Sequence, residues 1–520
     1  MPLPPERLML NRLAFGAGPE ELARFRQLGA GRWLDQQLAP GPDDEPELVQ
    51  RLAGLRLRIK YDAGDGFAAV DELRPLQYLD RDIADLWPLT DNKRKMAGPE
   101  RQRPRQEVAA ATLLRAFHSR WPLREVLVDF WHNHFNVNAA GDQAINVALP
   151  AYDRVIRHHA LGNFREFLEA VATSPAMLIY LNNRSSRAGS ANENYGRELF
   201  ELHSLGREAY LNELYNRWRD VPGALTGSPA GYIDQDVYEA ARAFTGWTIE
   251  DGAGLGGGRN LPATGRFTYV EAWHDNYQKR VLATDFDPFQ PPLADGRKVL
   301  DLIAAHPATA HFLCGKLCRR LVSDTPPYSL VKAAARVWSE NRKQPDQIRR
   351  VVAAIAHAAE MREGFGGKVK RPLELTASYV RAAGIDATVT GGLLGELDGS
   401  GQKLFGWSSP TGHPDSMDYW LSSHVLRKRW TLVSGLSDNW WGTGVFSPSA
   451  RLNRPVTAAQ AIALWHGELT GLEADGRTVA AILSGMQLAA GAPLPGDSRS
   501  DPVHRRILAC CAMTPAFNLR

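Results

Sequence analysis

The sequence predicts a mainly α-helical protein built from two or three lobes. Apolar residues recur with helical spacing along most of the chain. Glycine- and proline-rich stretches, rather than alternating strand patterns, separate those segments. The length of 520 residues exceeds the usual size of one hydrophobic core. We expect an N-terminal helical region over 1–249, a loop region with minor β structure over 250–292, and a C-terminal helical region over 293–520.

The N-terminal region is predicted to contain a series of helices. The strongest amphipathic patterns cover 105–119 and 123–135. A Glu-rich helix is predicted over 192–205, where Gly206 supplies a C-terminal cap. Asp234 is suited to cap a helix that continues to residue 245. The remaining helices predicted in this region cover 19–27, 31–38, 152–159, 164–172 and 175–181.

The pattern changes at residue 251 and returns to helix near residue 298. Residues 251–259 are dominated by glycine, and 266–270 have the composition of a short strand in a hairpin. The glycine-rich segment 388–414 is predicted to be loop. The helices predicted in the C-terminal region cover 298–305, 308–321, 330–340, 344–359, 372–383, 417–433, 458–465, 477–489 and 502–512.

Composition excludes several classes of protein. A net charge of +3 over this length argues against a dedicated nucleic-acid surface. The sequence contains no run of 18 apolar residues, so no membrane-spanning helix is expected. The start of the chain lacks a signal peptide and predicts a cytoplasmic protein as written; a removed leader would instead make it periplasmic or secreted. The 14 tryptophans, including Trp440 and Trp441, suit either burial or stacking against sugars.

The Glu-rich helix carries the most informative group of polar residues. At about 100° per residue, Glu193, Arg197, Glu198 and Glu201 fall on one arc of the helix together with Asn194. Glu193–Arg197 and Arg197–Glu201 have i,i+4 spacing, so a surface ladder of ion pairs is one interpretation. The other interpretation is a polar face that lines a cleft, where two carboxylates such as Glu193 and Glu198 act as acid and base on a glycosidic bond.

Histidines near the end of the 123–135 helix are candidate metal ligands. His132 and His134 point about 160° apart if the helix is regular, with His134 facing the apolar interior. One interpretation is a core histidine bonded to a buried partner. The alternative is metal ligation by His132, His134 and the later His203.

A third polar cluster follows the glycine-rich change of pattern. His274 and Asp275 are adjacent on a predicted loop, and such a pair occurs in both metal sites and acid–base sites. If the three clusters converge, they supply enough ligands for one divalent metal ion, with Asp275 among the catalytic candidates. The sequence has no nucleophile elbow, Walker loop or H-E-x-x-H motif.

Several segments spread along nearly the whole chain form a recognisable combination. They are Leu10-Asn-Arg-Leu-Ala-Phe-Gly16, Trp33-Leu-Asp-Gln-Gln-Leu38, Phe130-Trp-His-Asn-His-Phe135, Glu193-Asn-Tyr-Gly-Arg-Glu-Leu199 with Glu201-Leu-His203, Asp236 to Trp247, His274-Asp275 with Lys279, Lys370-Arg-Pro-Leu-Glu374, Gly406-Trp407 and Met513-Thr-Pro-Ala-Phe517. Together they resemble the bacterial family catalogued as domain of unknown function eighteen hundred. The resemblance implies no settled activity. Members of that family resemble secreted or periplasmic proteins encoded beside sulfatase-like partners, which implies a role on extracellular polymers.

These observations lead to one functional hypothesis and one alternative. The hypothesis is a hydrolase that acts on a polymer such as a polysaccharide, assisted by a divalent metal ion, with the three polar clusters in one cleft. The alternative is a non-catalytic binding or scaffold protein that works with a sulfatase-like partner, in which the same clusters are buried networks that fix helix contacts.

Overall fold

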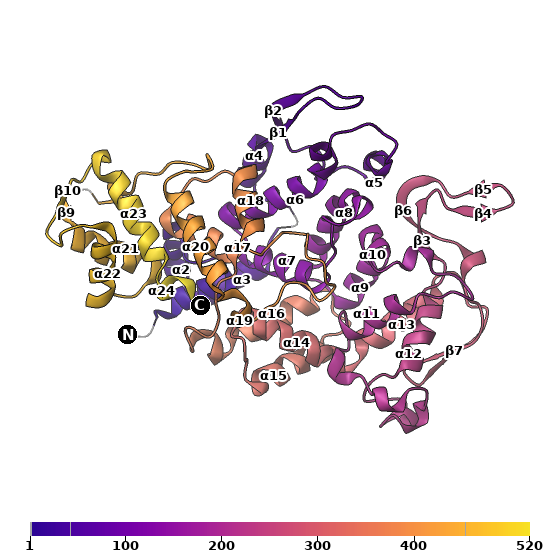
Figure 1. Ribbon diagram of the computed structural model, residues 1–520. Helices are drawn as coiled ribbons and strands as arrows, with labels where there is room; N and C mark the ends of the chain where they lie inside the picture. The colour runs from indigo at the N-terminus through magenta and orange to yellow at the C-terminus, as the bar shows by residue number, and fades with distance from the viewer. Residues whose placement is uncertain (1–2, 42, 453) are drawn as a thin grey trace.

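The computed structural model describes residues 3–41, 43–452 and 454–520 and confirms the mainly α-helical prediction. These residues form twenty-four α-helices and ten short strands, and every sheet has only two strands. In Figure 1 the C-terminal helices α20 to α24 gather with β9 and β10 at one end of the molecule, and α11 to α13 with β3 to β7 lie at the other. No helix among the described residues is long and apolar enough to cross a bilayer.

The first half of the chain is helical apart from one hairpin. Asp142 caps the N-terminus of α8 by accepting hydrogen bonds from the backbone of Ala144 and Ile145. Proline at the first position begins α7, which carries the two predicted histidines at its end. The helices are α1 (Pro5–Leu13), α2 (Pro19–Leu28), α3 (Ala30–Leu38), α4 (Pro46–Gly54), α5 (Ile83–Leu86), α6 (Gly98–His118), α7 (Pro122–His134), α8 (Gln143–His159), α9 (Phe164–Ala172), α10 (Pro175–Tyr180), α11 (Glu193–Glu201) and α12 (Asp234–Ala243).

The strands form antiparallel pairs, and the pairing of β3 with β6 confirms the strand predicted over 266–270. The strands are β1 (Arg56–Tyr61), β2 (Val70–Pro75), β3 (Trp247–Asp251), β4 (Gly254–Gly256), β5 (Arg259–Asn260), β6 (Ala263–Tyr269), β7 (Lys279–Val281), β8 (Thr284–Phe286), β9 (Val456–Thr457) and β10 (Pro493–Leu494).

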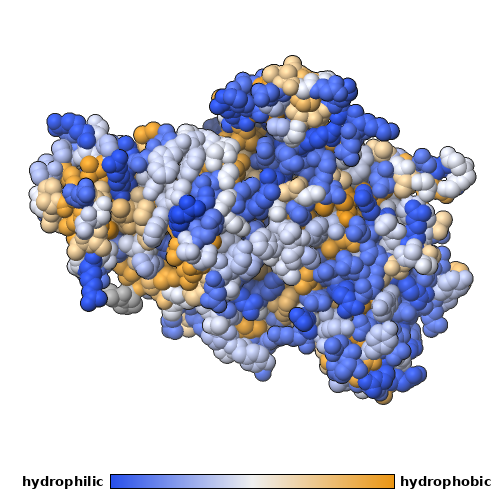
Figure 2. Space-filling view, in the orientation of Figure 1, coloured by the Kyte–Doolittle hydropathy of each residue, from blue (hydrophilic) through white to orange (hydrophobic). Residues whose placement is uncertain are grey.

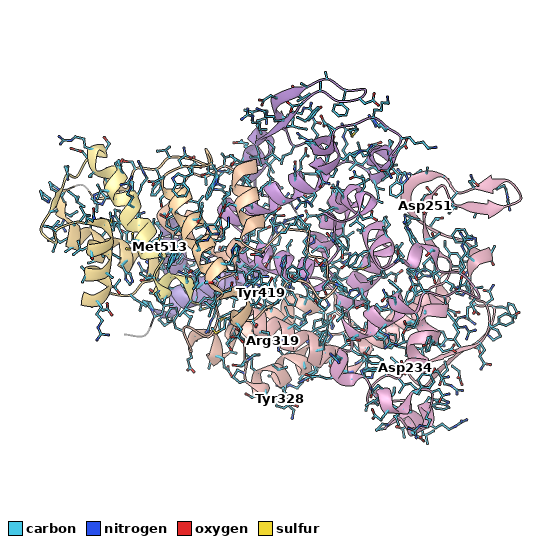
Figure 3. All side chains as sticks on the ribbon, viewed as in Figure 1. Asp234, Asp251, Arg319, Tyr328, Tyr419 and Met513 are labelled. Carbon is cyan, nitrogen blue, oxygen red and sulfur yellow. The ribbon has the colours of Figure 1, made fainter. Side chains whose placement is uncertain are left out.

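The second half is again a series of helices, drawn with all side chains in Figure 3. They are α13 (Ala294–Ala305), α14 (Pro307–Leu321), α15 (Tyr328–Glu340), α16 (Gln347–His357), α17 (Pro372–Ala383), α18 (Gly391–Gly399), α19 (Met417–Trp420), α20 (Ser423–Ser437), α21 (Ala458–Thr470), α22 (Gly476–Met486), α23 (Asp501–Ala512) and α24 (Pro515–Asn518).

One large hydrophobic core joins the two helical regions, with members from Met9 to Phe517. Polar contacts also connect distant parts of the chain. Arg12 on α1 is buried and donates hydrogen bonds to the carbonyl oxygens of Glu360 at 2.7 Å and Gly364 at 2.9 Å. The first helix is therefore held by residues that follow it by more than 340 positions. The division of the chain into three regions stays a prediction.

Several local elements differ from the sequence prediction, among them the helices α1 and α4, which were not predicted. The hairpin of β1 and β2 was not predicted, and the loop predicted over 388–414 contains the helix α18. Leu393 and Leu397 on α18 are fully buried, so packing outweighs the low helix propensity of its glycines. The Glu-rich helix ends at Glu201 rather than 205, and Gly206, with a φ of 86°, donates its N–H to the carbonyl of Phe200.

Candidate functional site

The end of α7 directs its two histidines to opposite sides, as helical geometry predicts. His132 lies 2.9 Å from Asp153 on α8, measured from Nε2 to Oδ1. His134 accepts a hydrogen bond at Nδ1 from Lys316 on α14 at 2.9 Å, and its Nε2 lies 3.3 Å from the carbonyl oxygen of His203. The two rings therefore belong to different polar networks.

His132 is oriented by a carboxylate that Arg157 also binds. Arg157 donates from Nε to Oδ2 of Asp153 at 2.8 Å, and also binds Glu125 at 2.7 Å. Burial by itself raises the pKa of Asp153, but the charge of Arg157 and the contact with His132 together lower it. Because Asp153 is ionised, Nε2 of His132 donates to it, and Nδ1 remains without a partner among the described residues.

A small, mainly apolar cavity borders His132 beneath the segment 402–413. Its volume is about 40 Å³, enough for a water molecule but not for a sugar ring. The lining residues with polar side chains are Thr112, Asp129, His132, Asn133, Asn136, Arg371, Gln402 and His413.

Two asparagines hold the segment 402–413 over this cavity. Asn133 accepts a hydrogen bond from the backbone N–H of His413 at 2.7 Å and donates to its carbonyl at 2.9 Å. Asn136 donates to the carbonyls of Trp407 and Ser409. Gly412 has a φ of 73°, and a Cβ there would lie 2.1 Å from the carbonyl oxygen of Asn133. The close approach of the segment to α7 therefore requires glycine.

Arg371 connects this cavity with a second one on the other side of Asn133. The second cavity, of about 30 Å³, is also lined by His134, Lys316 and Asp415. Arg371 forms ion pairs with Asp129 and with Glu374. These groups were missed in the sequence, except that Arg371 and Glu374 lie in a segment of the family resemblance. The groups that line the two cavities lie far apart in the sequence, so no local pattern predicts that they are in contact.

The Glu-rich helix contributes one i,i+4 ion pair, and the carboxylates of Glu198 and Glu201 have no partner among the described residues. Arg197 donates to Glu193 at 2.8 Å, which confirms that i,i+4 pair, and donates to Asp234 rather than to Glu201. Glu198 is half-buried and has no hydrogen-bond partner among the described residues. Burial, followed by the charge of Glu201, raises the pKa of Glu198.

Tyr180 binds the segment that covers the cavity. The hydroxyl of Tyr180 donates to the carbonyl of Ser408 at 2.7 Å. Burial raises the pKa of Tyr180 to about 12, and the charge of Glu198 adds to this rise, whereas Asn136 opposes it. Asn136 also lines the cavity beside His132.

The third predicted cluster forms its own network. His274 contacts the carbonyl of Thr245 at 2.9 Å and Asp295 at 3.2 Å, and Asp295 also binds the buried Lys279 at 2.7 Å. Asp275 accepts two hydrogen bonds from Arg242. Burial alone raises the pKa of Asp275, but the bonds from Arg242 lower it overall.

The structure thus joins two of the three predicted clusters. His134 and His203 bring α7 and the end of α11 together, with ring centroids 6.2 Å apart. Burial and the charge of Lys316 lower the pKa of His203 to about 3. Within the described ranges, no three His, Cys, Asp or Glu side chains are grouped so that they could hold a metal ion. The metal assignment of His132, His134, His203 and His274 stays a prediction.

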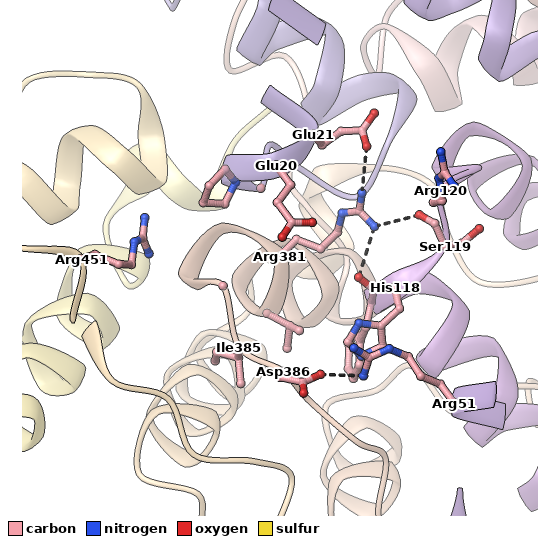
Figure 4. Close-up of a pocket in the computed structure, with 15 residues that line it drawn as sticks. Glu20, Glu21, Arg51, His118, Ser119, Arg120, Arg381, Ile385, Asp386 and Arg451 are labelled. Atoms are coloured by element: carbon pink, nitrogen blue, oxygen red, sulfur yellow. Dashed lines mark hydrogen bonds and ion pairs between the residues drawn. The ribbon is translucent and has the colours of Figure 1, made fainter. Parts of the chain in front are cut away.

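A larger cavity lies elsewhere, where α2, α6 and α17 meet (Figure 4). Its volume is about 540 Å³, and its charged groups largely pair with one another. Arg51 binds Asp386 at 2.6 Å, and Arg381 donates to the carbonyls that end α6. None of the predicted site residues lines this cavity.

The fold and these networks define a large multi-helical protein with an extensive polar interior around the end of α7. The family model described as Protein of unknown function (DUF1800) matches residues 8–519, so the chain belongs to that family. No curated protein and no solved structure matches the chain.

Proposed function

We propose that this protein is a hydrolase that acts on a carbohydrate polymer, with His132 as the group that activates water. One observation carries the proposal: an imidazole oriented by Asp153 borders a cavity of about 40 Å³. A cavity of this size suits a single attacking water. Nδ1 of His132 is the acceptor for its proton, and ionised Asp153 stabilises the imidazolium that forms.

Glu198 is the proton donor in this proposal. A raised pKa keeps a carboxyl group protonated closer to neutral pH, as an acid that protonates a leaving oxygen requires. The charge of Glu198 acts on Tyr180, whose hydroxyl binds the segment over the cavity beside His132. Glu193 and Arg197 then serve to hold α11 through their ion pair.

The surface above the cavity supports a carbohydrate as substrate. The indole of Trp407 stacks 4.5 Å from His413 and lies 6.0 Å from Tyr419, which is exposed. Aromatic rings of this kind offer an apolar face to sugar rings while polar groups nearby bind hydroxyls. Since the cavity is too small for a sugar, the segment 402–413 has to move when substrate reaches His132.

The test measures new reducing ends after incubation with a panel of soluble neutral and acidic polysaccharides. His132→Gln is expected to lower the rate on the order of 100-fold or more, the usual contribution of a general base. His466→Gln is the matched control, because His466 is equally buried but lies on α21 and binds the carbonyl of Leu472. Wild-type protein without activity on the panel, or equal rates for both variants, would contradict the proposal.

A second candidate is the scaffold function, which the local pairing of the polar clusters favours. His274, Asp275 and His134 each have protein partners, as expected for networks that fix helix contacts. In this case the protein binds a polymer or a sulfatase-like partner without cleaving it. His132→Gln would then lower the melting temperature, and no polysaccharide would be cleaved by any variant.

A further inference from the structure

A cavity remote from α7 lies where the C-terminal ends of α20, α22 and α23 meet. Its volume is about 370 Å³, within the range of small-molecule sites. Met513, labelled in Figure 3, lies just after α23 at its wall. Figure 2 shows hydrophobic atoms reaching the surface over the C-terminal helices at the left, between charged patches. The principal lining residues are Ser434, Asp438, Trp440, Met486, Arg506 and Met513.

The turn that follows α20 exposes the side chain of Trp440. Asn439 adopts a left-handed φ of 55°, and the N–H of Trp440 donates to the carbonyl of Gly435 at 2.9 Å. The next residue, Trp441, packs so closely on α20 that a Cβ at Gly435 would lie 2.3 Å from its ring. Because Trp441 anchors the turn, its neighbour Trp440 points outward and remains 58% exposed.

Polar groups stand at the rim beside this indole. Nε of Arg506 lies 4.0 Å from Oδ2 of Asp438, and both side chains keep solvent access. Ser434 adds a hydroxyl to the lining. Together they offer a carboxylate acceptor, guanidinium donors and a hydroxyl at the edge of an exposed aromatic face.

We propose that this cavity is a second carbohydrate-binding site, in which a sugar ring stacks on Trp440 while Asp438 and Arg506 bind its hydroxyl groups. An exposed indole provides apolar area at low entropic cost, and an acidic and a basic group side by side match adjacent hydroxyls that both accept and donate. Binding here does not depend on hydrolysis at His132.

The test is a glycan array probed with the full-length protein, followed by titration of the strongest glycan against intrinsic tryptophan fluorescence. Trp440→Ala is expected to weaken binding on the order of tenfold or more, as removal of an aromatic anchor does. Trp430→Ala is the matched control, because Trp430 is 49% exposed on α20, the helix that precedes Trp440, but does not line the cavity. It should bind as the wild type does.

A second variant keeps the test decisive if Trp440→Ala perturbs the fold. Asp438→Asn retains the indole and removes the charged acceptor, so binding should weaken while the melting temperature stays near that of the wild type. Absence of any glycan binding, or unchanged affinity in Trp440→Ala and Asp438→Asn, would overturn the inference. Loss of cleavage in His132→Gln with glycan binding intact separates this site from the proposed active site.

Discussion

Nε2 of His132 on α7 lies 2.9 Å from Oδ1 of Asp153 on α8, and the other oxygen of that carboxylate binds Arg157. A histidine at the C-terminal end of a helix is thereby fixed in ring orientation by the helix that packs beside it. The same arrangement leaves the second ring nitrogen facing the cavity. The contact between His132 and Asp153 therefore affects both the stability of the interior and the proposed chemistry.

Asp153→Asn should destabilise the protein by about 3 kcal/mol, because it leaves Arg157 buried with one partner fewer. The pKa of Asp153 is lowered in the folded state, so the wild-type advantage exists above the ordinary carboxyl pKa and is lost as pH falls. Urea unfolding at pH 7 and at about pH 2, well below the ordinary carboxyl pKa, measures both effects. Asp301→Asn is the control: Asp301 is 66% exposed and pairs with Arg165, so its loss should cost less than about 1 kcal/mol.

Gly412→Ala should loosen the segment over the cavity. A methyl group would collide with the carbonyl of Asn133, and the left-handed φ adds strain, so we expect a loss on the order of 2–3 kcal/mol. Gly258→Ala is the control. Gly258 has a similar φ of 77°, but no atom lies within 4 Å of the added carbon, so this change measures the backbone strain alone. Thermal unfolding and proteolysis at 402–413 are the measurements. Equal effects of the two changes would show that the contact contributes nothing.

Lys370→Met should remove a pH dependence of stability above neutral pH. Burial lowers the pKa of Lys370 to about 7, and the ammonium has Ser378 as its hydrogen-bond partner at 2.9 Å. Between about pH 7 and 10 the unfolded chain binds more protons here, so stability rises with pH by up to about 1.4 kcal/mol per unit. Urea unfolding midpoints measured between about pH 7 and 10 test this pH dependence of stability. A curve for Lys370→Met with the wild-type slope would refute the assignment, and exposed Lys60→Met is the control.

Glu198→Gln should leave the protein as stable as the wild type or slightly more stable at neutral pH. Because burial raises the pKa of Glu198, its ionised form disfavours the folded state, and stability falls as pH rises through that pKa. We expect a gain of roughly 0.5 kcal/mol, since the side chain is only half-buried. Glu193→Gln breaks the pair with Arg197 and should not stabilise. A clear drop in melting temperature for Glu198→Gln would mark Glu198 as structural.

Local periodicity was enough to predict the helical class, the ladder from Glu193 to Arg197, and the opposite directions of His132 and His134. Each of these follows from the geometry of one helix. The partner of His132 could not be predicted in this way, since Asp153 lies 21 residues later on a different helix. The contact of Asn133 with His413 spans 280 residues, and no pattern in either local sequence predicts it.

Composition also misled where tertiary packing decided the structure. The glycines of 388–414 indicated loop, but burial of Leu393 and Leu397 stabilises α18. The convergence of three clusters was a hypothesis about packing. In the structure, His134 at the end of α7 contacts His203 just after α11. His274 instead contacts Asp295 and Thr245.

The bonds from Arg12 to Glu360 and Gly364 constrain how the polypeptide is made. At about 5–20 residues per second, the 348 residues between Arg12 and Glu360 correspond to roughly 20–70 seconds of translation. During that interval α1 can pack on α2 and α7, which follow it early in the chain, but the carbonyl groups that bind its buried guanidinium have not been synthesised. Arg12 therefore gains its native hydrogen bonds only late in synthesis.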